Sequence, residues 1–293
     1  MNRQIADKLF LKSALCHQNE QISIGQVLLW LRKQSNKVEV SVTQCPLKAI
    51  EGWNYNEKKD LIEHQSGGFF SIEGIDIKSN CLQEEWQQPI INQAEVGYLG
   101  IIAKEINSVL HFLLQAKIEP GNVNYVQLSP TLQATRSNYT RVHKGKKPLY
   151  LDYFINARPE QVLVDQLQSE QGGRFLRKRN RNIIIKITEE IKIGERFIWL
   201  TLSQIKSLMQ YDNVVNMDTR SVISCISFGK KIENDIRLET SSTDPRKMDF
   251  LKSSMSTISK FTIFQLMSFL ANIKSKCVLS IEKVKLNCLD NWS

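Results

Sequence analysis

The amino-acid sequence predicts an α+β protein, and three observations lead to that prediction. Residues 24–31 place apolar side chains at positions i, i+3, i+4 and i+7, which is one face of a helix. Residues 97–106 and 109–118 are two apolar runs separated by Asn107-Ser108, a pattern typical of a β-hairpin. A helix-strand pattern that begins at Ile24 occurs again at Ile263. Helices and hairpin strands mixed along one chain are typical of the α+β class.

The composition is that of an ordinary globular protein with a basic surface. Hydrophobic residues make up 42% of the 293 residues, and the formal net charge is +9. Such a charge attracts anions, whether nucleic acid, an anionic membrane surface or a phosphorylated small molecule. No apolar run is long enough to serve as a signal peptide or a membrane span. The six cysteines form no C-x-x-C pair, so we expect no metal and a reduced, cytoplasmic protein.

The helix-strand pattern at residues 24–53 recurs without a gap at residues 263–292. The offset is 239 residues, since 292 − 53 = 239. Identical residues at both places are Ile24, Gln26, Leu31, Lys37, Ser41, Leu47 and Trp53 of the first copy. After each helix an alternation follows that predicts a half-buried strand: Val38, Val40 and Val42 first, then Cys277, Leu279 and Ile281. Two unrelated amphipathic helices could look similar, but the gap-free match favours duplication.

The duplication predicts the organisation of the chain. We expect residues 1–235 to form a first repeat with N-terminal helices, 236–257 to form a linker, and 258–293 to be the truncated start of a second repeat. A terminal helix and strand would then have nothing in this chain to cover their apolar faces. Residues 258–292 are therefore predicted to stay uncovered, so that the chain dimerises through them, binds a separately encoded second repeat, or aggregates.

Between the two copies, the remaining elements follow from local patterns. Gly67 to Ile72 is a turn that leads into a strand, and residues 87–90 are an exposed, extended stretch because of Pro89. Residues 183–187 are a strand. Residues 199–209 are predicted to be a helix, which Thr201 or Ser203 could cap. His111 lies within an apolar predicted strand and is expected to be a core histidine with satisfied hydrogen bonds.

Five stretches resemble the NDP-hexose 2,3-dehydratase family. They are QSGGFFSIEGI (65–75), EEWQQPIINQAEVGYLGIIAKE (84–105), VLHFLLQAKIEPGNVNYVQLSPTLQATRSNYTRVHKG (109–145), QLQSEQGGRFLRKRNRN (166–182) and WLTLSQIKSLMQYDNVVNMDTRSV (199–222). The resemblance implies two tandem repeats, each a Nudix-like mixed sheet flanked by helices, and a dimer. The metal-binding R-E-x-x-E-E-x-G cluster of Nudix hydrolases is absent from the sequence, so metal-dependent pyrophosphate hydrolysis is not expected.

The resemblance also implies a reaction. The family's substrates are nucleoside-diphospho-4-keto-6-deoxyhexoses, usually the dTDP form. These lyases remove the C3 proton and the C2 hydroxyl in deoxysugar biosynthesis, without a redox cofactor. The site needs a base, an acid, donors for the enolate and cations for the diphosphate.

Two polar segments supply candidates for these roles. In residues 135–143, Tyr139 or His143 could be the acid or base, and Arg136, Ser137, Asn138 and Arg141 could bind substrate. In residues 168–182, Glu170 is a candidate C3 base. If residues 177–182 are a strand, the side chains of Arg177, Arg179 and Arg181 share one face and could bind diphosphate, with Lys178 nearby. Trp86 beside Gln88 could stack on the nucleobase.

Each candidate has a plainer alternative. The first segment could be an exposed polar loop, the second a solvated basic edge strand, and Trp86 a core residue. The whole chain could be a catalytically incomplete remnant or subunit that binds a nucleotide sugar and needs a separate second repeat. Nucleic-acid binding is the weakest hypothesis, because the RKRNR run lacks the interleaved aromatic residues of a single-strand platform.

Overall fold

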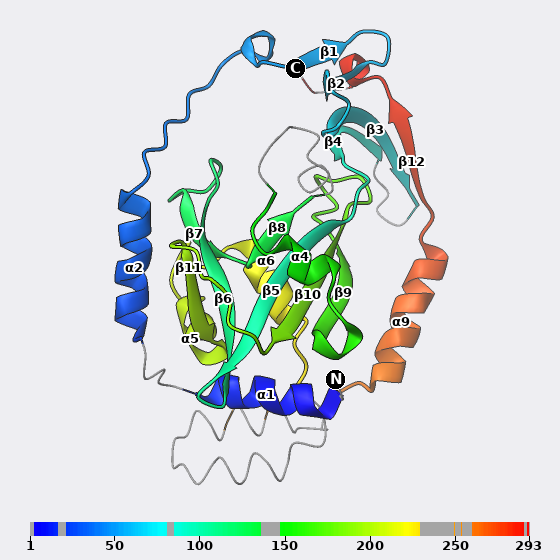
Figure 1. Cartoon of the computed structure of the whole chain (residues 1–293). Helices are drawn as coiled ribbons and strands as arrows, with labels where there is room; N and C mark the ends of the chain where they lie inside the picture. Colours follow the sequence, from blue (N-terminus) through cyan, green and yellow to red (C-terminus); the bar gives the residue numbers. More distant parts are fainter. Residues whose placement is uncertain are drawn as a thin grey trace. The chain divides into compact units, whose positions relative to one another are not determined.

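The computed structural model describes residues 3–16, 22–80, 85–135, 147–228, 249, 253, 260–289 and 292 (Figure 1). It confirms the α+β class. The chain divides into two compact units. The first unit comprises residues 1–43, 96–168 and 180–255, and the second comprises residues 44–95, 169–179 and 256–293.

A mixed seven-stranded sheet forms the centre of the first unit. Its strands run in the order β11-β6-β5-β10-β9, while β7 pairs with β6 and β8 with β5. Strands β5 and β10 are parallel, whereas β6 is antiparallel to its three neighbours. The bounds are β5 (Gly97–Ile106), β6 (Val109–Ile118), β7 (Val126–Ser129), β8 (Leu132–Ala134), β9 (Val162–Ser169), β10 (Arg179–Ile187) and β11 (Phe197–Thr201).

The predicted hairpin is confirmed, because β5 and β6 end and begin where the sequence placed them. Asn107 and Ser108 both have positive φ angles, 49° and 61°, as a two-residue hairpin turn with the right twist requires. His111 lies on β6 and is buried. Its Nδ1 lies 2.8 Å from the carbonyl oxygen of Val109, and burial lowers the pKa of the imidazole.

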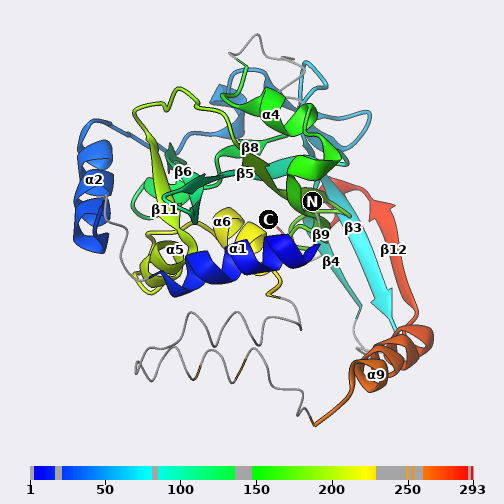
Figure 2. The ribbon, with the colours of Figure 1, turned by 60° about the horizontal axis from the view of Figure 1, so that its bottom comes forward.

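Helices cover the first unit's sheet: α1 (Arg3–Leu15), α2 (Ile24–Asn36), α4 (Leu151–Ile155), η2 (Pro159–Gln161), α5 (Leu202–Leu208) and α6 (Met217–Ser224). Helix α1 lies beside α5 (Figure 2). The Ser13 hydroxyl joins them to the sheet, since it donates to the Leu110 carbonyl oxygen at 2.5 Å and accepts from the Leu202 amide at 2.8 Å. Helix α2 buries Val27 and Leu31, the face that the apolar spacing predicted.

Two predictions for the first unit are corrected. Residues 199–201 are not helical, because they continue β11 and pair with residues 111–113 of β6. The helix starts at Leu202, and Thr201 is its N-cap, as proposed. The half-buried strand expected at Val38, Val40 and Val42 is also wrong. No strand is assigned between Lys37 and Pro46, and Val42 is 58% exposed.

A five-stranded sheet forms the second unit. It consists of β1 (Trp53–Asn56), β2 (Leu61–His64), β3 (Ser71–Ser79), β4 (Glu85–Asn92) and β12 (Leu279–Val284). Strand β3 pairs with β4 on one edge and with β12 and β2 on the other. Ile75, Ile77 and Ile90 form its small core. Residues 87–90 are extended as predicted, but they belong to β4, and Ile90 is buried rather than exposed because it packs into this core.

The second copy of the repeat completes the second unit with α9 (Ile263–Lys276), β12 and η3 (Leu286–Cys288); η1 (Leu47–Ala49) is the counterpart of η3 in the first copy. Every residue of α9 is exposed, as predicted for this segment. The prediction fails for the strand that follows, because β12 pairs with β3 and Leu289 is buried. The predicted linker, residues 236–257, lies outside the described residues apart from Asp249 and Ser253, so the domain boundaries stay predictions.

The cysteines of the chain are not all reduced thiols. Cys277 is disulfide-bonded, so the prediction that all six cysteines are reduced is wrong there. Among the described residues, Cys16, Cys45, Cys225 and Cys288 are not in disulfide bonds. Within the described part of the chain, no helix has the length and apolar character needed to cross a membrane.

Candidate functional site

A loop at residues 169–179 packs along β4 in the second unit. The Ile91 amide donates to the Arg174 carbonyl oxygen at 2.8 Å, and the Leu176 amide donates to the Ile91 carbonyl oxygen at 2.9 Å. The Gln88 amide nitrogen donates to the Gly173 carbonyl oxygen at 2.9 Å, and the Trp86 indole donates to Gln88 Oε1 at 2.9 Å. The fold therefore brings together two stretches, 84–105 and 166–182, that the sequence proposed separately.

Lys178 fixes the end of this loop. Its side chain is 3% exposed, and its ammonium donates to the Glu95 carbonyl oxygen at 2.9 Å. Burial lowers the pKa of Lys178, against the opposing effect of the nearby Glu95 and Glu170 carboxylates. The backbone closes the loop at the same point, where the Glu170 amide donates to the Lys178 carbonyl oxygen at 2.9 Å. Glu170 is thus a half-buried carboxylate held near a buried cation. We call Trp86, Gln88, Glu170, Arg177 and Lys178 the β4 cluster.

The three arginines do not share a strand face. Arg177 has a φ angle of 53° and precedes β10, which begins at Arg179. Arg179 is exposed. Arg181 forms a two-pronged ion pair with Asp165, with nitrogen–oxygen distances of 2.7 and 2.5 Å, and also donates to the Tyr98 hydroxyl at 3.1 Å. Its hydrogen bonds to Asp165 raise the pKa of Arg181. Arg181 is therefore engaged within the first unit, and of these three arginines Arg177 and Arg179 remain the candidates for an anionic ligand.

The other polar segment proposed to bind substrate is residues 135–143. Arg136, Ser137, Asn138, Tyr139, Arg141 and His143 lie outside the described residues. Gln133, shortly before these residues, and Pro148, shortly after them, both line one pocket of the first unit.

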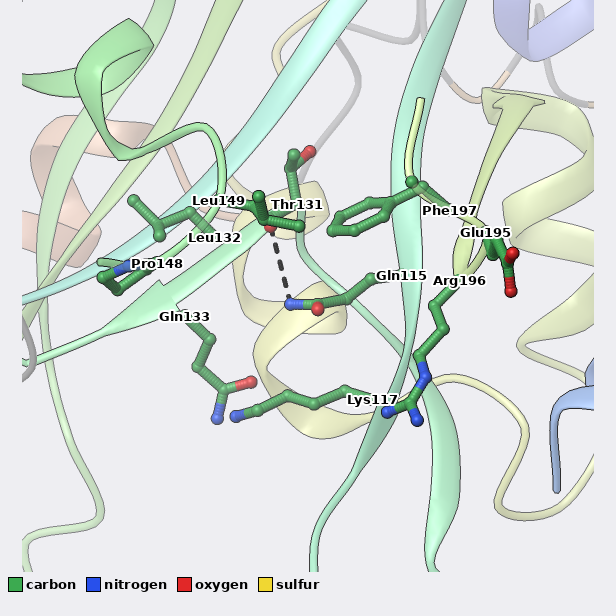
Figure 3. A pocket seen from close by; sticks show the side chains of 11 residues that line it. Gln115, Lys117, Thr131, Leu132, Gln133, Pro148, Leu149, Glu195, Arg196 and Phe197 are labelled. Carbon is green, nitrogen blue, oxygen red and sulfur yellow. Dashed lines mark hydrogen bonds between the residues drawn. The ribbon is translucent and has the colours of Figure 1, made fainter. Parts of the chain in front are cut away.

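That pocket, of about 410 Å³, lies where β6, β8 and the start of β11 meet (Figure 3). Its polar wall holds two cations, Lys117 and Arg196, and its apolar wall includes Leu149 and Phe197. Lys117 is paired with Glu119 at 2.9 Å, and Gln133 donates to the same carboxylate at 2.9 Å. The pocket can thus take a ligand with both an apolar and a polar part.

Sequence reasoning missed Lys117, Gln133 and Arg196. Lys117 belonged to a stretch interpreted as an apolar hairpin strand, and Arg196 to a loop without any motif. The one available signal was that Gln133 adjoins the polar segment proposed to bind substrate. In the described part of the chain no group of three or more histidine, cysteine, aspartate or glutamate residues could hold a metal ion.

Comparison with solved structures gives only distant similarity. An ADP compounds hydrolase matches with a TM-score of 0.35 and 10% identity, over 59% of this chain and 89% of that one. A Caenorhabditis elegans Ap4A hydrolase matches with a TM-score of 0.27 and 12% identity, over 41% of this chain and 89% of that one. The Nudix-like topology therefore stays a prediction from the resemblance.

Comparison with curated proteins is far closer. A protein of Saccharopolyspora spinosa named dTDP-4-dehydro-6-deoxy-alpha-D-glucopyranose 2,3-dehydratase is 41% identical over 284 residues, which cover 97% of this chain and 58% of the relative. One of the same name from Amycolatopsis orientalis is 38% identical over 98% of this chain and 57% of its own length. The chain thus spans less than two thirds of these relatives. The family model described as NDP-hexose 2,3-dehydratase matches residues 24–226. This chain belongs to the NDP-hexose 2,3-dehydratase family.

Proposed function

We propose that this chain is part of a hydro-lyase that removes water across C2 and C3 of a dTDP-4-keto-6-deoxyhexose. The observation that carries the proposal is the match to relatives named as such dehydratases along nearly the whole chain. The β4 cluster supports it, because the loop that carries Glu170, Arg177 and Lys178 is hydrogen-bonded to β4, which carries Trp86 and Gln88.

The chemistry defines what the site must supply. The C4 ketone acidifies the C3 proton, and a base removes it as the electron pair moves to the C4 oxygen. When that enolate collapses back to the ketone, the C2–O bond breaks and the hydroxyl leaves as water after an acid protonates it. The resulting C2–C3 enol tautomerises to a 3,4-diketone. One water is lost and no net oxidation occurs, so acid–base residues and donors are enough.

We assign the C3 base to Glu170. Its carboxylate is half-buried, and the backbone bond to Lys178 holds its position in the loop. Lys178 acts as a positioning residue, since its ammonium is tied to the Glu95 carbonyl oxygen.

Substrate binding is assigned to the more accessible members of the site. Trp86 is 37% exposed and its indole N–H is already engaged by Gln88, which leaves a ring face for the nucleobase. Arg177 and Arg179 are exposed and suit diphosphate oxygens. On the sequence alone, Tyr139 or His143 supplies the acid, while Arg136, Ser137, Asn138 and Arg141 contact the substrate.

Proton exchange at C3 tests this assignment directly. The chain is incubated with dTDP-4-keto-6-deoxyglucose in D₂O, and NMR follows both deuterium uptake at C3 and formation of the 3,4-diketone. Glu170→Gln should slow C3 exchange by at least about 100-fold, the usual contribution of a general base. The matched control is Glu189→Gln, an exposed glutamate in the first unit, which should leave exchange unchanged.

Three outcomes separate the possibilities. Unchanged exchange in Glu170→Gln would refute Glu170 as the base. If the unaltered chain binds the dTDP-sugar by calorimetry but neither exchanges C3 nor forms product, the alternative of a non-catalytic binding subunit is supported. If it binds no dTDP-sugar at all, the proposed function is wrong for this chain.

A further inference from the structure

The two copies of the helix-strand pattern fold alike locally. Helix α2 begins with a capping box between Ser23 and Gln26, and α9 begins with one between Thr262 and Gln265, at the same offset of 239 residues (262 − 23 = 239). The short helices η1 and η3 also correspond at that offset (286 − 47 = 239). The copies differ in which part of each is covered.

The first copy has its helix covered and its strand uncovered. Val27 and Leu31 of α2 are 0% and 7% exposed, packed into the main core of the first unit. Residues 40–45, which align with β12, pair with no described strand. Val42 is exposed there, although its counterpart Ile281 packs against the core of the second unit.

The second copy shows the reverse. Leu266 and Leu270, the counterparts of Val27 and Leu31, are 44% and 57% exposed. Strand β12 is fully paired along residues 74–79 of β3 and stands beside it in Figure 2. Leu289 is buried against β3, where a Cβ built on Gly74 would come within 3.2 Å of its side chain, while its counterpart Ile50 remains exposed.

These two deficits define one partner. It must have an apolar surface like the one on which α2 packs, and that surface must be unoccupied so that α9 can bind there. It must also have an unpaired sheet edge, like the edge of β3 with which β12 pairs, so that residues 40–45 can pair with it. Another copy of this chain offers neither, because its own α2 and β12 already fill both places. A second repeat that begins with α9 and β12 offers both. Its helix-binding surface is empty until α9 packs on it, and its sheet edge is open because β12 pairs with β3 instead.

We propose that this chain assembles with a second repeat by reciprocal strand exchange. Strand β12 of the second copy completes the sheet of the first repeat, and residues 40–45 complete the equivalent sheet of the second repeat. Helix α9 packs on the second repeat as α2 packs on the first. The match to nearly all of this chain takes up 58% of the relative from Saccharopolyspora spinosa. The rest of that protein is long enough to hold a second repeat.

The exchange also predicts a sequence feature of the partner. Gly74 is required because a Cβ there would lie 2.8 Å from the Val284 carbonyl oxygen of the incoming strand. The strand of the second repeat that receives residues 40–45 should therefore carry a glycine at the matching position. Ile50 would then be buried there as Leu289 is buried on β3.

The test mixes this full chain with a probe. The probe is the segment of the Saccharopolyspora spinosa relative that lies outside its match to this chain. Sedimentation should show a one-to-one complex, formed by mixing or, if the probe does not fold alone, by co-expression. Hydrogen exchange should slow at residues 40–45 and 263–276, with no change at residues 279–284, which are already paired. None of these measurements involves substrate, so their outcome is independent of the proposed dehydration.

Variants make the test specific. Val42→Pro removes a ladder donor and should weaken association at least about tenfold, because a lost hydrogen bond and a strained strand together exceed 1.4 kcal/mol. Val42→Ile is the matched control, since Ile281 stands at the equivalent position of β12, and it should bind normally. Leu266→Asp should also weaken binding. No complex on mixing or co-expression, a complex without protection of residues 40–45, or a homodimer of this chain that protects both segments would each overturn the proposal.

Discussion

The arginines near β10 show how identical side chains acquire different roles from their neighbours. Arg177→Ala and Arg179→Ala should each weaken dTDP-sugar binding about tenfold or more, because each removes a charge-assisted contact worth about 1.5–3 kcal/mol. Arg181→Ala should instead leave binding unchanged and lower the melting temperature, since Arg181 is engaged with Asp165 and Tyr98. Calorimetry and thermal unfolding on the three variants measure both effects. Equal loss of binding in all three would show that the predicted common face exists after all.

Glu73 should make the second unit sensitive to acid. Burial by itself raises the pKa of this carboxyl, but hydrogen bonds from Lys283, Asn92 and Ser71 outweigh it, and the pKa lies below the ordinary value of 4.5. A depressed pKa means that the carboxylate's stabilising contribution is present above pH 4.5 and is lost as the pH falls through the lower, folded value.

Because Lys283 lies on β12 and Glu73 on β3, acid should release β12 first. Hydrogen exchange at residues 279–284 should speed up as the pH falls below the ordinary carboxyl pKa of 4.5, after correction for the intrinsic rate. In Glu73→Gln this pH dependence should largely disappear. An exchange profile that is the same in both proteins would rule out Glu73 as the titrating group.

At the scale of single elements, close packing against glycine is a testable constraint. A Cβ built on Gly100 of β5 would lie 2.4 Å from the ring of Phe154 on α4. Gly100→Ala should therefore destabilise the first unit by about 1–3 kcal/mol, the usual cost of overpacking. Denaturant unfolding measures this. Phe154→Leu in the same chain should recover part of the loss, whereas an unchanged midpoint in Gly100→Ala would show that α4 moves away freely.

Elements governed by local patterns could be predicted from the sequence, and those governed by a distant partner could not. The hairpin turn needs two residues that tolerate positive φ, and Asn107-Ser108 is visible in the sequence. By contrast, residues 199–201 fit a helix, and only their pairing with β6 makes them a strand. Residues 40–45 have a strand-like alternation, but no described strand pairs with them.

The same distinction applies to the candidate site. Glu170, Trp86 and Gln88 could be predicted from their side-chain chemistry. The contact between their segments depends on the Gln88–Gly173 hydrogen bond, which no sequence periodicity predicts. The sequence could not distinguish the roles of Lys178 and Arg181 from that of Arg177. Lys178 is buried beside Glu95 and Arg181 is ion-paired with Asp165, and both partners are distant in the sequence.

For the molecule as a whole, we expect dehydration to need no added metal. The proposed steps use only acid–base and hydrogen-bonding groups, and the Nudix metal cluster is absent from the sequence. Activity of the assembled protein should be the same with and without EDTA. Loss of turnover on chelation, restored by magnesium, would contradict this. Calcium as the restoring ion serves as a control for nonspecific effects of charge.

The capping box at the start of α9 has a consequence for how quickly the molecule assembles. A 14-residue helix without tertiary contacts is only marginally stable in water. The Thr262–Gln265 cap shifts that balance by roughly 1 kcal/mol towards the helix, using groups within four consecutive residues. A docking partner would therefore meet a largely preformed helix, and little ordering entropy remains to be lost in the encounter. Assembly should then be limited by diffusion and orientation rather than by folding, so its rate should rise linearly with partner concentration without reaching a plateau.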